Sequence, residues 1–185
     1  MPRQRAVGRL FENRIVVWEI VDARRLFKEG YYGKPLGIPK PKDFEFDAPL
    51  VLDLMEGYFL MTKKTLAIED QSGRSLTAKE MQETCESSYS DFPEKFLVYR
   101  KLRDEGYVVT PGIKFGSDFA VYEHGPGIDH APYIVQVMNR SSSMTATSMV
   151  RSGRLATTVR KQFIIAIPDT EKKTVDFLRY DWWRA

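Results

Sequence analysis

The chain has 185 residues, of which 43% are hydrophobic and 29% are charged, and its formal net charge is +3 at pH 7. This length and composition favour a folded protein with a real core, slightly long for one average domain. The sequence has no run of about 18 apolar residues, so it predicts no membrane span.

Few residues of the types that bind metals or form disulfides are present. One cysteine, Cys85, excludes an intramolecular disulfide and a thiolate zinc site, and two histidines, His124 and His130, exclude a His-rich metal cluster. The basic start of the chain lacks the apolar stretch of a secretory signal. We therefore expect a cytoplasmic protein in a reducing compartment, with no metal or other cofactor.

In the N-terminal part, short α and β patterns follow one another. Asp22 is the expected cap of the first helix, and Thr77 with Glu80 forms a capping box that opens the last one. The expected elements are a strand over 14–20, a helix over 23–28, a helix over 49–62, a strand over 65–69 with a turn at 71–73, and a helix over 77–86.

A segment of different composition lies between the first two of these helices. Residues 31–42, with the sequence YYGKPLGIPKPK, hold three prolines, two glycines and three lysines. Neither a helix nor a sheet ladder tolerates this spacing of proline and glycine, so a loop is predicted.

In the C-terminal part, a helix is followed mostly by strands. Asp91, Pro93 and Glu94 form a helix start, and Gly106 is its end. The expected strands cover 107–110, 114–123, 132–138, 162–167 and 174–183, and one helix covers about 145–160.

These patterns predict an α/β (α+β) protein that divides near Ser88. Residues 1–88 form a small N-terminal mixed α/β domain that carries the basic loop 33–42. Residues 89–185 form a C-terminal domain with a mixed β-sheet flanked by helices.

Charge is distributed unevenly along the chain. Residues 1–42 carry ten Lys/Arg against four Asp/Glu, and residues 43–106 carry eight against fourteen. Residues 139–161 hold five basic residues and no acid. Such a segment favours a polyanion, of which nucleic-acid phosphates are the commonest. A solvated basic helix face explains the charge equally well.

Three ionisable side chains fall at the ends of predicted strands, where catalytic groups are common. Tyr122 and His130 flank a turn, and Lys161 ends the basic helix. Metal-free cleavage of RNA needs a base, an acid and a cation, and these residue types supply all three. Taken singly, each has a structural alternative: a packed strand tyrosine, a loop histidine and a charge at a helix C-terminus.

Three linked motifs resemble the tRNA-splicing endonuclease family in its archaeal form. They are KFGSDFAVY over 114–122, HAPYIV over 130–135 and RLATTVRK over 154–161, in the family's order. The resemblance covers roughly residues 91–185. It implies that the C-terminal domain is a nuclease domain. It also implies metal-independent cleavage of precursor tRNA at intron–exon junctions, at a bulge-helix-bulge motif, with 2′,3′-cyclic phosphate and 5′-hydroxyl ends.

The resemblance also assigns roles to single residues. It makes Tyr122 the general base, His130 the general acid and Lys161 the electrostatic stabiliser. A phenol is a weak base at neutral pH unless nearby cations favour its charged form. His124 matches no family position and is expected to be dispensable.

RNA-binding residues are expected in three places. By the resemblance, Arg154 forms half of a pincer around a flipped base, and Trp182 or Trp183 is a candidate for stacking, with edge-strand packing as the alternative. Lys34, Lys40 and Lys42 are expected to contact phosphates, with a solvated linker as the alternative.

Residues 168–173, PDTEKK, contain the parts of a metal-dependent nuclease signature. The spacing reads as a hairpin turn, which argues against a metal site. The resemblance instead implies that Asp169 and Glu171 dock into a basic pocket of a neighbouring subunit. An ordinary charged turn is the alternative.

The partners implied are precursor tRNA and further subunits. One nuclease unit per chain requires assembly for two cleavages, and a heterotetramer with a second, non-catalytic subunit is favoured over a homotetramer. Two other functions stay open: a non-catalytic RNA-binding or structural subunit of the same assembly, and a basic RNA-binding module.

Overall fold

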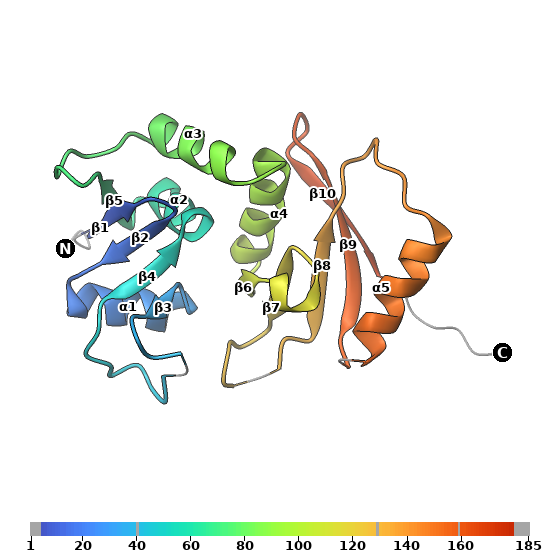
Figure 1. The fold of residues 1–185 in the computed structure, drawn as a ribbon, viewed down its shortest axis with the longest axis horizontal. Helices are drawn as coiled ribbons and strands as arrows, with labels where there is room; N and C mark the ends of the chain where they lie inside the picture. Colours follow the sequence, from blue (N-terminus) through green and yellow to red (C-terminus); the bar gives the residue numbers. More distant parts are fainter. Residues whose placement is uncertain (1–4, 40, 129, 159, 180–185) are drawn as a thin grey trace. The chain divides into compact units, whose positions relative to one another are not determined.

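The chain folds as two compact units, of which the first ends at Ser90 and the second begins at Asp91 (Figure 1). The computed structural model describes residues 5–39, 41–128, 130–158 and 160–179. Each unit contains one five-stranded mixed sheet with helices packed against it. The predicted α+β class is confirmed.

The first unit is built on a sheet in the order β3-β4-β2-β1-β5. Strands β1 and β5 pair in parallel, and the other neighbours are antiparallel. Helices α1 and α2 pack on the sheet, and α3 packs on α2. The elements are β1 (Ala6–Phe11), β2 (Arg14–Val17), α1 (Ile20–Gly30), β3 (Lys34–Pro35), β4 (Leu50–Asp53), α2 (Leu54–Thr62), β5 (Leu66–Glu69) and α3 (Ala78–Ser88).

Buried and more exposed residues alternate along the central strands of this sheet, and the buried ones form the core of the first unit. Ile15 and Val17 of β2 and Leu50 and Leu52 of β4 are fully buried. Every residue of α2 from Leu54 to Leu60 is also buried. Removal of this apolar surface from water is the main stabilising contribution.

The predicted capping box at the start of α3 is confirmed. The Thr77 backbone N–H donates to a carboxylate oxygen of Glu80 at 2.8 Å, and the Thr77 hydroxyl accepts from the Glu80 N–H at 3.2 Å. Both N–H groups would otherwise be unpaired at the helix start.

The predictions for the first unit need correction in four places. Strand β1 is missed, because Ala6–Phe11 lacks a strong β-branched pattern. The helix predicted over 49–62 begins only after Asp53, since the preceding four residues pair with β2. The strand predicted over 14–20 ends at Val17, and α1 begins at Ile20, so Asp22 lies in its first turn and pairs with Arg25 at 2.7 Å instead of capping it.

The prediction that residues 31–42 form only a loop needs correction near the start of this segment, which joins the sheet. Lys34 and Pro35 form the edge strand β3 opposite Val51 and Leu50 of β4, a position where proline is tolerated. Gly33 precedes this strand with φ of +69°, and a Cβ there would lie 2.6 Å from the Val51 carbonyl oxygen. Glycine is therefore required at this point.

The second unit is built on a sheet in the order β10-β9-β8-β7-β6. Strands β8 and β9 are parallel and are connected through α5, and the other neighbours are antiparallel. Figure 1 shows α4 and α5 on opposite sides of this sheet. The elements are α4 (Phe92–Asp104), β6 (Val108–Pro111), η1 (Ile113–Phe115), β7 (Phe119–Tyr122), β8 (Tyr133–Val137), α5 (Ala146–Thr158), β9 (Gln162–Asp169) and β10 (Thr174–Arg179).

Two predictions for the second unit need correction. The strand predicted over 114–123 forms only over Phe119–Tyr122, because the chain first makes the 3-10 turn η1. Asp91 occupies the N-cap position of α4 but has φ of 54° and makes no capping hydrogen bond with its side chain. The predicted strand over 174–183 is present as far as Arg179, and residues 180–183 lie outside the described residues.

Within the part of the chain that the structure describes, none of the helices has the length and apolar character required to cross a membrane.

Candidate active site at the ends of three strands

Three neighbouring strands of the second sheet have their ends at one edge. Strand β7 ends at Tyr122, and β8 and β9 begin at Tyr133 and Gln162. Pairing of Tyr133 with both Val121 and Gln162 aligns these ends. We call this the β7–β9 edge; it consists of Tyr122, residues 130–132 and Lys161.

Lys161 contacts the turn that carries His130. Its ammonium group donates a hydrogen bond to the backbone carbonyl of Ala131, the residue after His130. The next residue, Gln162, donates its backbone N–H to the Pro132 carbonyl at 2.8 Å. Side-chain and backbone contacts together hold the start of β9 against the start of β8.

The other two predicted catalytic residues differ in exposure. Tyr122 is half-buried and pairs with Val108 of β6, whereas His130 is exposed. His124 is also exposed, in the turn that follows β7. The end of β7, the turn before β8 and the residue before β9 thus place Tyr122, His130 and Lys161 at the β7–β9 edge, and only Lys161 is distant in sequence from the other two.

An unusual backbone conformation precedes Lys161. Arg160 has φ of 54°, the left-handed region, and its N–H donates to the Thr157 carbonyl at 3.1 Å. A residue other than glycine rarely adopts this conformation, and such residues are frequent at functional sites. The turn ends α5 and directs the chain into β9 directly after Lys161.

One contact near this edge was not expected from the sequence. The Tyr133 hydroxyl donates to a carboxylate oxygen of Glu123 at 2.9 Å, and this bond raises the pKa of Tyr133 because it stabilises the protonated phenol. The ring of Tyr107 meets that of Tyr133 edge to face, with centroids 6.3 Å apart. Tyr133 is part of the HAPYIV motif, and this motif is the feature of the sequence that could have pointed to Tyr133 as a site residue.

The predicted RNA-binding residues are only partly described. Arg154 is exposed on α5, as is Arg151 one turn earlier. Lys34 and Lys42 are both exposed, and both belong to the first unit. Lys40 and Trp182, like Trp183, lie outside the described residues.

Asp169 and Glu171 lie at the predicted hairpin turn between β9 and β10. Asp169 pairs with Thr174 in the ladder, and Glu171 is exposed in the turn. One Asp169 oxygen accepts the Lys172 backbone N–H at 2.9 Å, and the other lies 3.5 Å from the Arg140 guanidinium. The backbone hydrogen bond chiefly, with the positive charges nearby, lowers the pKa of Asp169. Asp169 is thus engaged within its own chain.

No cluster of three or more His, Cys, Asp or Glu side chains suited to a metal ion occurs among the residues whose positions are described.

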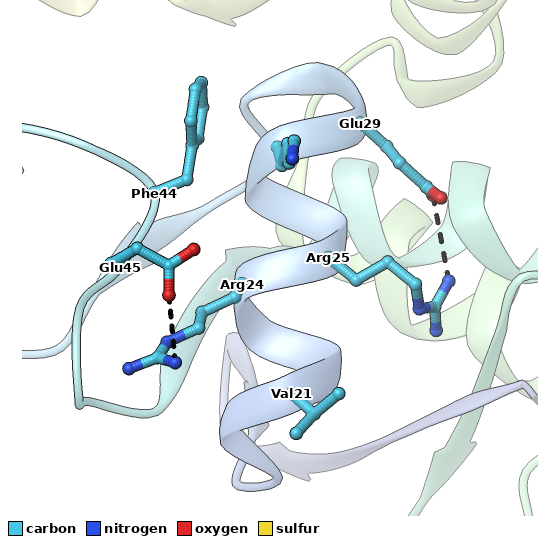
Figure 2. Close-up of a pocket in the computed structure, with 7 residues that line it drawn as sticks. Val21, Arg24, Arg25, Glu29, Phe44 and Glu45 are labelled. Carbon is cyan, nitrogen blue, oxygen red and sulfur yellow. Dashed lines mark ion pairs between the residues drawn. The ribbon is translucent and has the colours of Figure 1, made fainter.

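A groove of about 560 Å³ runs along α1 in the first unit. Figure 2 shows Arg24 paired with Glu45 and Arg25 paired with Glu29 in this groove. Its two arginines are therefore neutralised locally, and it contains none of the predicted catalytic residues, so we assign it no ligand.

Comparison with known proteins identifies both units. A family model described as the catalytic C-terminal domain of tRNA intron endonuclease matches residues 92–177. A second model, described as the N-terminal domain of tRNA intron endonuclease, matches residues 6–82.

Similar full-length proteins give the same result. The chain is 46% identical to a tRNA-splicing endonuclease of Hyperthermus butylicus, over 91% of this chain and 93% of the relative. It is 37% identical to one from Sulfurisphaera tokodaii, over 95% and 98% of the two chains. It is 40% identical to one from Pyrobaculum arsenaticum, over 92% and 94%.

Proposed function

Because the chain belongs to the tRNA-splicing endonuclease family, we propose that it cleaves precursor tRNA at intron–exon junctions, in a bulge-helix-bulge motif. The proposal is supported above all by the β7–β9 edge, where Tyr122, His130 and Lys161 come from three separate segments. A tyrosine, an imidazole and an ammonium group at one edge suit phosphoryl transfer to an internal hydroxyl.

The proposed reaction is an internal transesterification. The 2′-oxygen attacks the adjacent phosphorus, and the bond from phosphorus to the 5′-oxygen of the next nucleotide breaks. Tyr122 in its phenolate form accepts the proton of the 2′-hydroxyl, and His130 in its imidazolium form gives a proton to the departing 5′-oxygen. The products are a 2′,3′-cyclic phosphate and a 5′-hydroxyl, and neither water nor metal enters the balance.

Lys161 stabilises the charge that develops on the phosphorane oxygens. A cation that is already in place acts mainly in the transition state, so it accelerates the chemical step more than it strengthens binding. The contact with Ala131 supports this role, because it keeps the ammonium next to the turn of the proposed acid, His130.

RNA contacts outside the β7–β9 edge are proposed for two regions. Arg154 on α5, together with Trp182, holds a flipped bulge base by stacking. Lys34, Lys40 and Lys42 contact phosphates without reading bases, so they widen the range of bulged RNAs that are cleaved. The exposure of Arg154 and Lys34 supports these roles.

We also propose that the active enzyme is an assembly, with a heterotetramer containing a second, non-catalytic subunit favoured over a homotetramer. Each chain supplies one β7–β9 edge, whereas excision of an intron requires two cleavages. Asp169 and Glu171 are proposed to contact a neighbouring subunit. Because Asp169 already contacts Arg140, Glu171 is the more available of the two.

The deciding experiment is single-turnover cleavage of a bulged precursor by the native assembly, prepared with and without a co-expressed second subunit. A substrate with a 2′-deoxy nucleotide at the cleavage site should bind but stay intact. Cleavage of the normal substrate should persist in excess EDTA on prefolded RNA and give cyclic-phosphate ends. Binding without cleavage in every preparation would favour the alternative, a non-catalytic RNA-binding or structural subunit.

A further inference from the structure

The aromatic ring of Phe115 lies next to the ammonium group of Lys161. The Lys161 nitrogen is 5.0 Å from the ring centroid and faces the ring. This distance is within the range in which the negative face of an aromatic ring attracts a cation. The charged end of Lys161 therefore meets both the Phe115 ring and the Ala131 carbonyl.

The position of the Phe115 ring is fixed by a tight turn. The Phe115 backbone N–H donates to the Gly112 carbonyl at 2.8 Å, and the Gly112 N–H donates to the Asp118 carbonyl at 2.8 Å. A Cβ on Gly112 would lie 2.7 Å from the Phe119 nitrogen, so the turn closes only with glycine there. Gly116 leaves the turn with φ of +64°.

Core packing fixes the ring further. Phe115 packs against the buried cluster of Ile134, Phe163 and Ile165, which belongs to β8 and β9. The same two strands begin at the β7–β9 edge. The ring is thus held between the hydrophobic core and the Lys161 ammonium.

A lysine needs such support more than most residues do. Its four-carbon stem has many rotamers, and restricting them costs conformational entropy each time the group must occupy one place. A fixed aromatic face restricts the ammonium before RNA binds, without consuming any of its three N–H donors in a hydrogen bond to the ring.

We propose that Phe115 is a positioning residue that holds the Lys161 ammonium at the β7–β9 edge through its aromatic face. The inference rests on the proposed role of Lys161 in cleavage. When a phosphate arrives, the ammonium donates to a phosphate oxygen and keeps its contact with the ring. Phe115 itself touches neither the RNA nor the reacting atoms.

Stepwise fluorination of the Phe115 ring tests this role, because fluorine weakens the negative face while the ring keeps nearly its size and apolar character. We expect the single-turnover cleavage rate of the native assembly to fall progressively, by roughly three- to thirtyfold at full substitution. RNA affinity and the melting temperature should change little. Among ordinary variants, Phe115→Leu should be slowed by a similar factor, and Phe115→Tyr should restore the rate.

Two controls make the outcome specific. Phe119 is buried in the same sequence motif and contacts the Tyr99 ring, so fluorination there should leave the rate unchanged. In a Lys161→Ala background, fluorination of Phe115 should no longer change the cleavage rate, since the ammonium group that the ring contacts is absent. An unchanged rate along the Phe115 series, with Lys161→Ala inactive, would overturn the positioning role alone. Full activity of Lys161→Ala would instead overturn the proposed role of Lys161 and this inference with it.

Discussion

A carboxylate oxygen of Glu56 accepts the backbone N–H of Gly33 at 3.0 Å, although the two residues are 23 positions apart. The other oxygen of the same buried carboxylate accepts the Asp53 N–H at 2.9 Å and completes the capping box of α2. One side chain thus starts a helix and attaches the beginning of the lysine-bearing loop to the first unit. The loop is therefore held in place where it begins, at Gly33.

Glu56→Gln should lower the free energy of unfolding by about 1–3 kcal/mol. The two carboxylate oxygens accept the N–H groups of Gly33 and Asp53, whereas an amide has one oxygen and would place its own N–H against one of these donors. Hydrogen exchange at the Gly33 amide should become faster. Denaturant unfolding and exchange measured by NMR check both effects. Glu80→Gln is the matched control: Glu80 also completes a capping box, but its hydrogen bonds there are exposed and its carboxylate pairs with Arg74 instead of Gly33, so the effect should be smaller and Gly33 exchange unchanged.

His130→Ala and Lys161→Ala should each reduce the single-turnover cleavage rate by about two orders of magnitude or more, with little loss of RNA binding, because proton donation and phosphorane stabilisation act in the transition state. Tyr122→Phe should be damaging but milder, since water can accept the proton. Rapid-quench kinetics and filter binding separate the two quantities. His124→Ala is the control and should resemble the parent protein; an essential His124 with a dispensable His130 would refute the assignment.

Glu171→Gln should weaken assembly more than it weakens the fold, because an exposed turn residue has little core to lose and its charge-assisted contacts lie with a partner. Asp169→Asn should weaken both the assembly and the fold, since Asp169 also accepts the Lys172 N–H and lies near Arg140. Gel filtration with light scattering and thermal melts measure the two effects. Unchanged assembly in both variants would contradict the subunit contact and make residues 168–173 an ordinary hairpin turn.

Replacing Lys34, Lys40 and Lys42 together with alanine should spare stability and the cleavage of an ideal symmetric bulged substrate. Cleavage of substrates with shortened or missing bulges should slow, because their weaker fit depends more on phosphate contacts. The slope of binding affinity against salt concentration, on logarithmic axes, should flatten by up to about one unit for each phosphate that a lysine no longer neutralises.

A second triple variant, Lys64, Lys79 and Lys101 to alanine, removes the same charge outside the loop and serves as control. It should cleave both substrate types like the parent protein. Equal cleavage of both substrate types by the loop variant would make residues 33–42 a linker.

Cys85 should react with thiol reagents only when the protein unfolds. Burial chiefly, with the charges of Asp53 and Glu86, raises the pKa of Cys85 to about 12, and its thiol lies 3.7 Å from the Leu54 carbonyl. Above the ordinary value near 9, the unfolded thiol loses its proton while the folded one keeps it, so this group's contribution to stability falls as pH rises toward 12. Alkylation at pH 8 that follows the denaturant transition would confirm this; rapid labelling of the native protein would contradict it.

The sequence predicts local features of this fold well and non-local ones poorly. The capping box of Thr77 and Glu80 is confirmed because both partners lie within four residues. Strand β4 resembles part of a helix in the sequence because Leu50 and Leu54 also fit helical spacing, and only pairing with β2 decides the matter. Strand β3 depends in the same way on β4, which lies farther along the chain.

The candidate site shows the same division. Strand ends at Tyr122 and before Gln162 could be predicted from β-rich runs, and the motifs singled out Tyr122, His130 and Lys161. The contact between Lys161 and Phe115 could not be predicted, because it depends on the side-chain directions of two residues that are 46 positions apart in sequence. The pairing of Tyr133 with Glu123 is of the same kind.

The direction of the parallel pair β8 and β9 has an electrostatic consequence. Open α/β sheets commonly bind anions at the carboxyl ends of parallel strands, where helix N-termini present positive dipole ends. Here the β7–β9 edge lies at the amino ends of β8 and β9, so α5 arrives with its C-terminal, partially negative end at Thr158. A phosphate at this edge gains nothing from the helix dipole, and the cations of Arg160 and Lys161 must overcome it. Attraction of the phosphate is thereby concentrated in side chains that a single substitution removes.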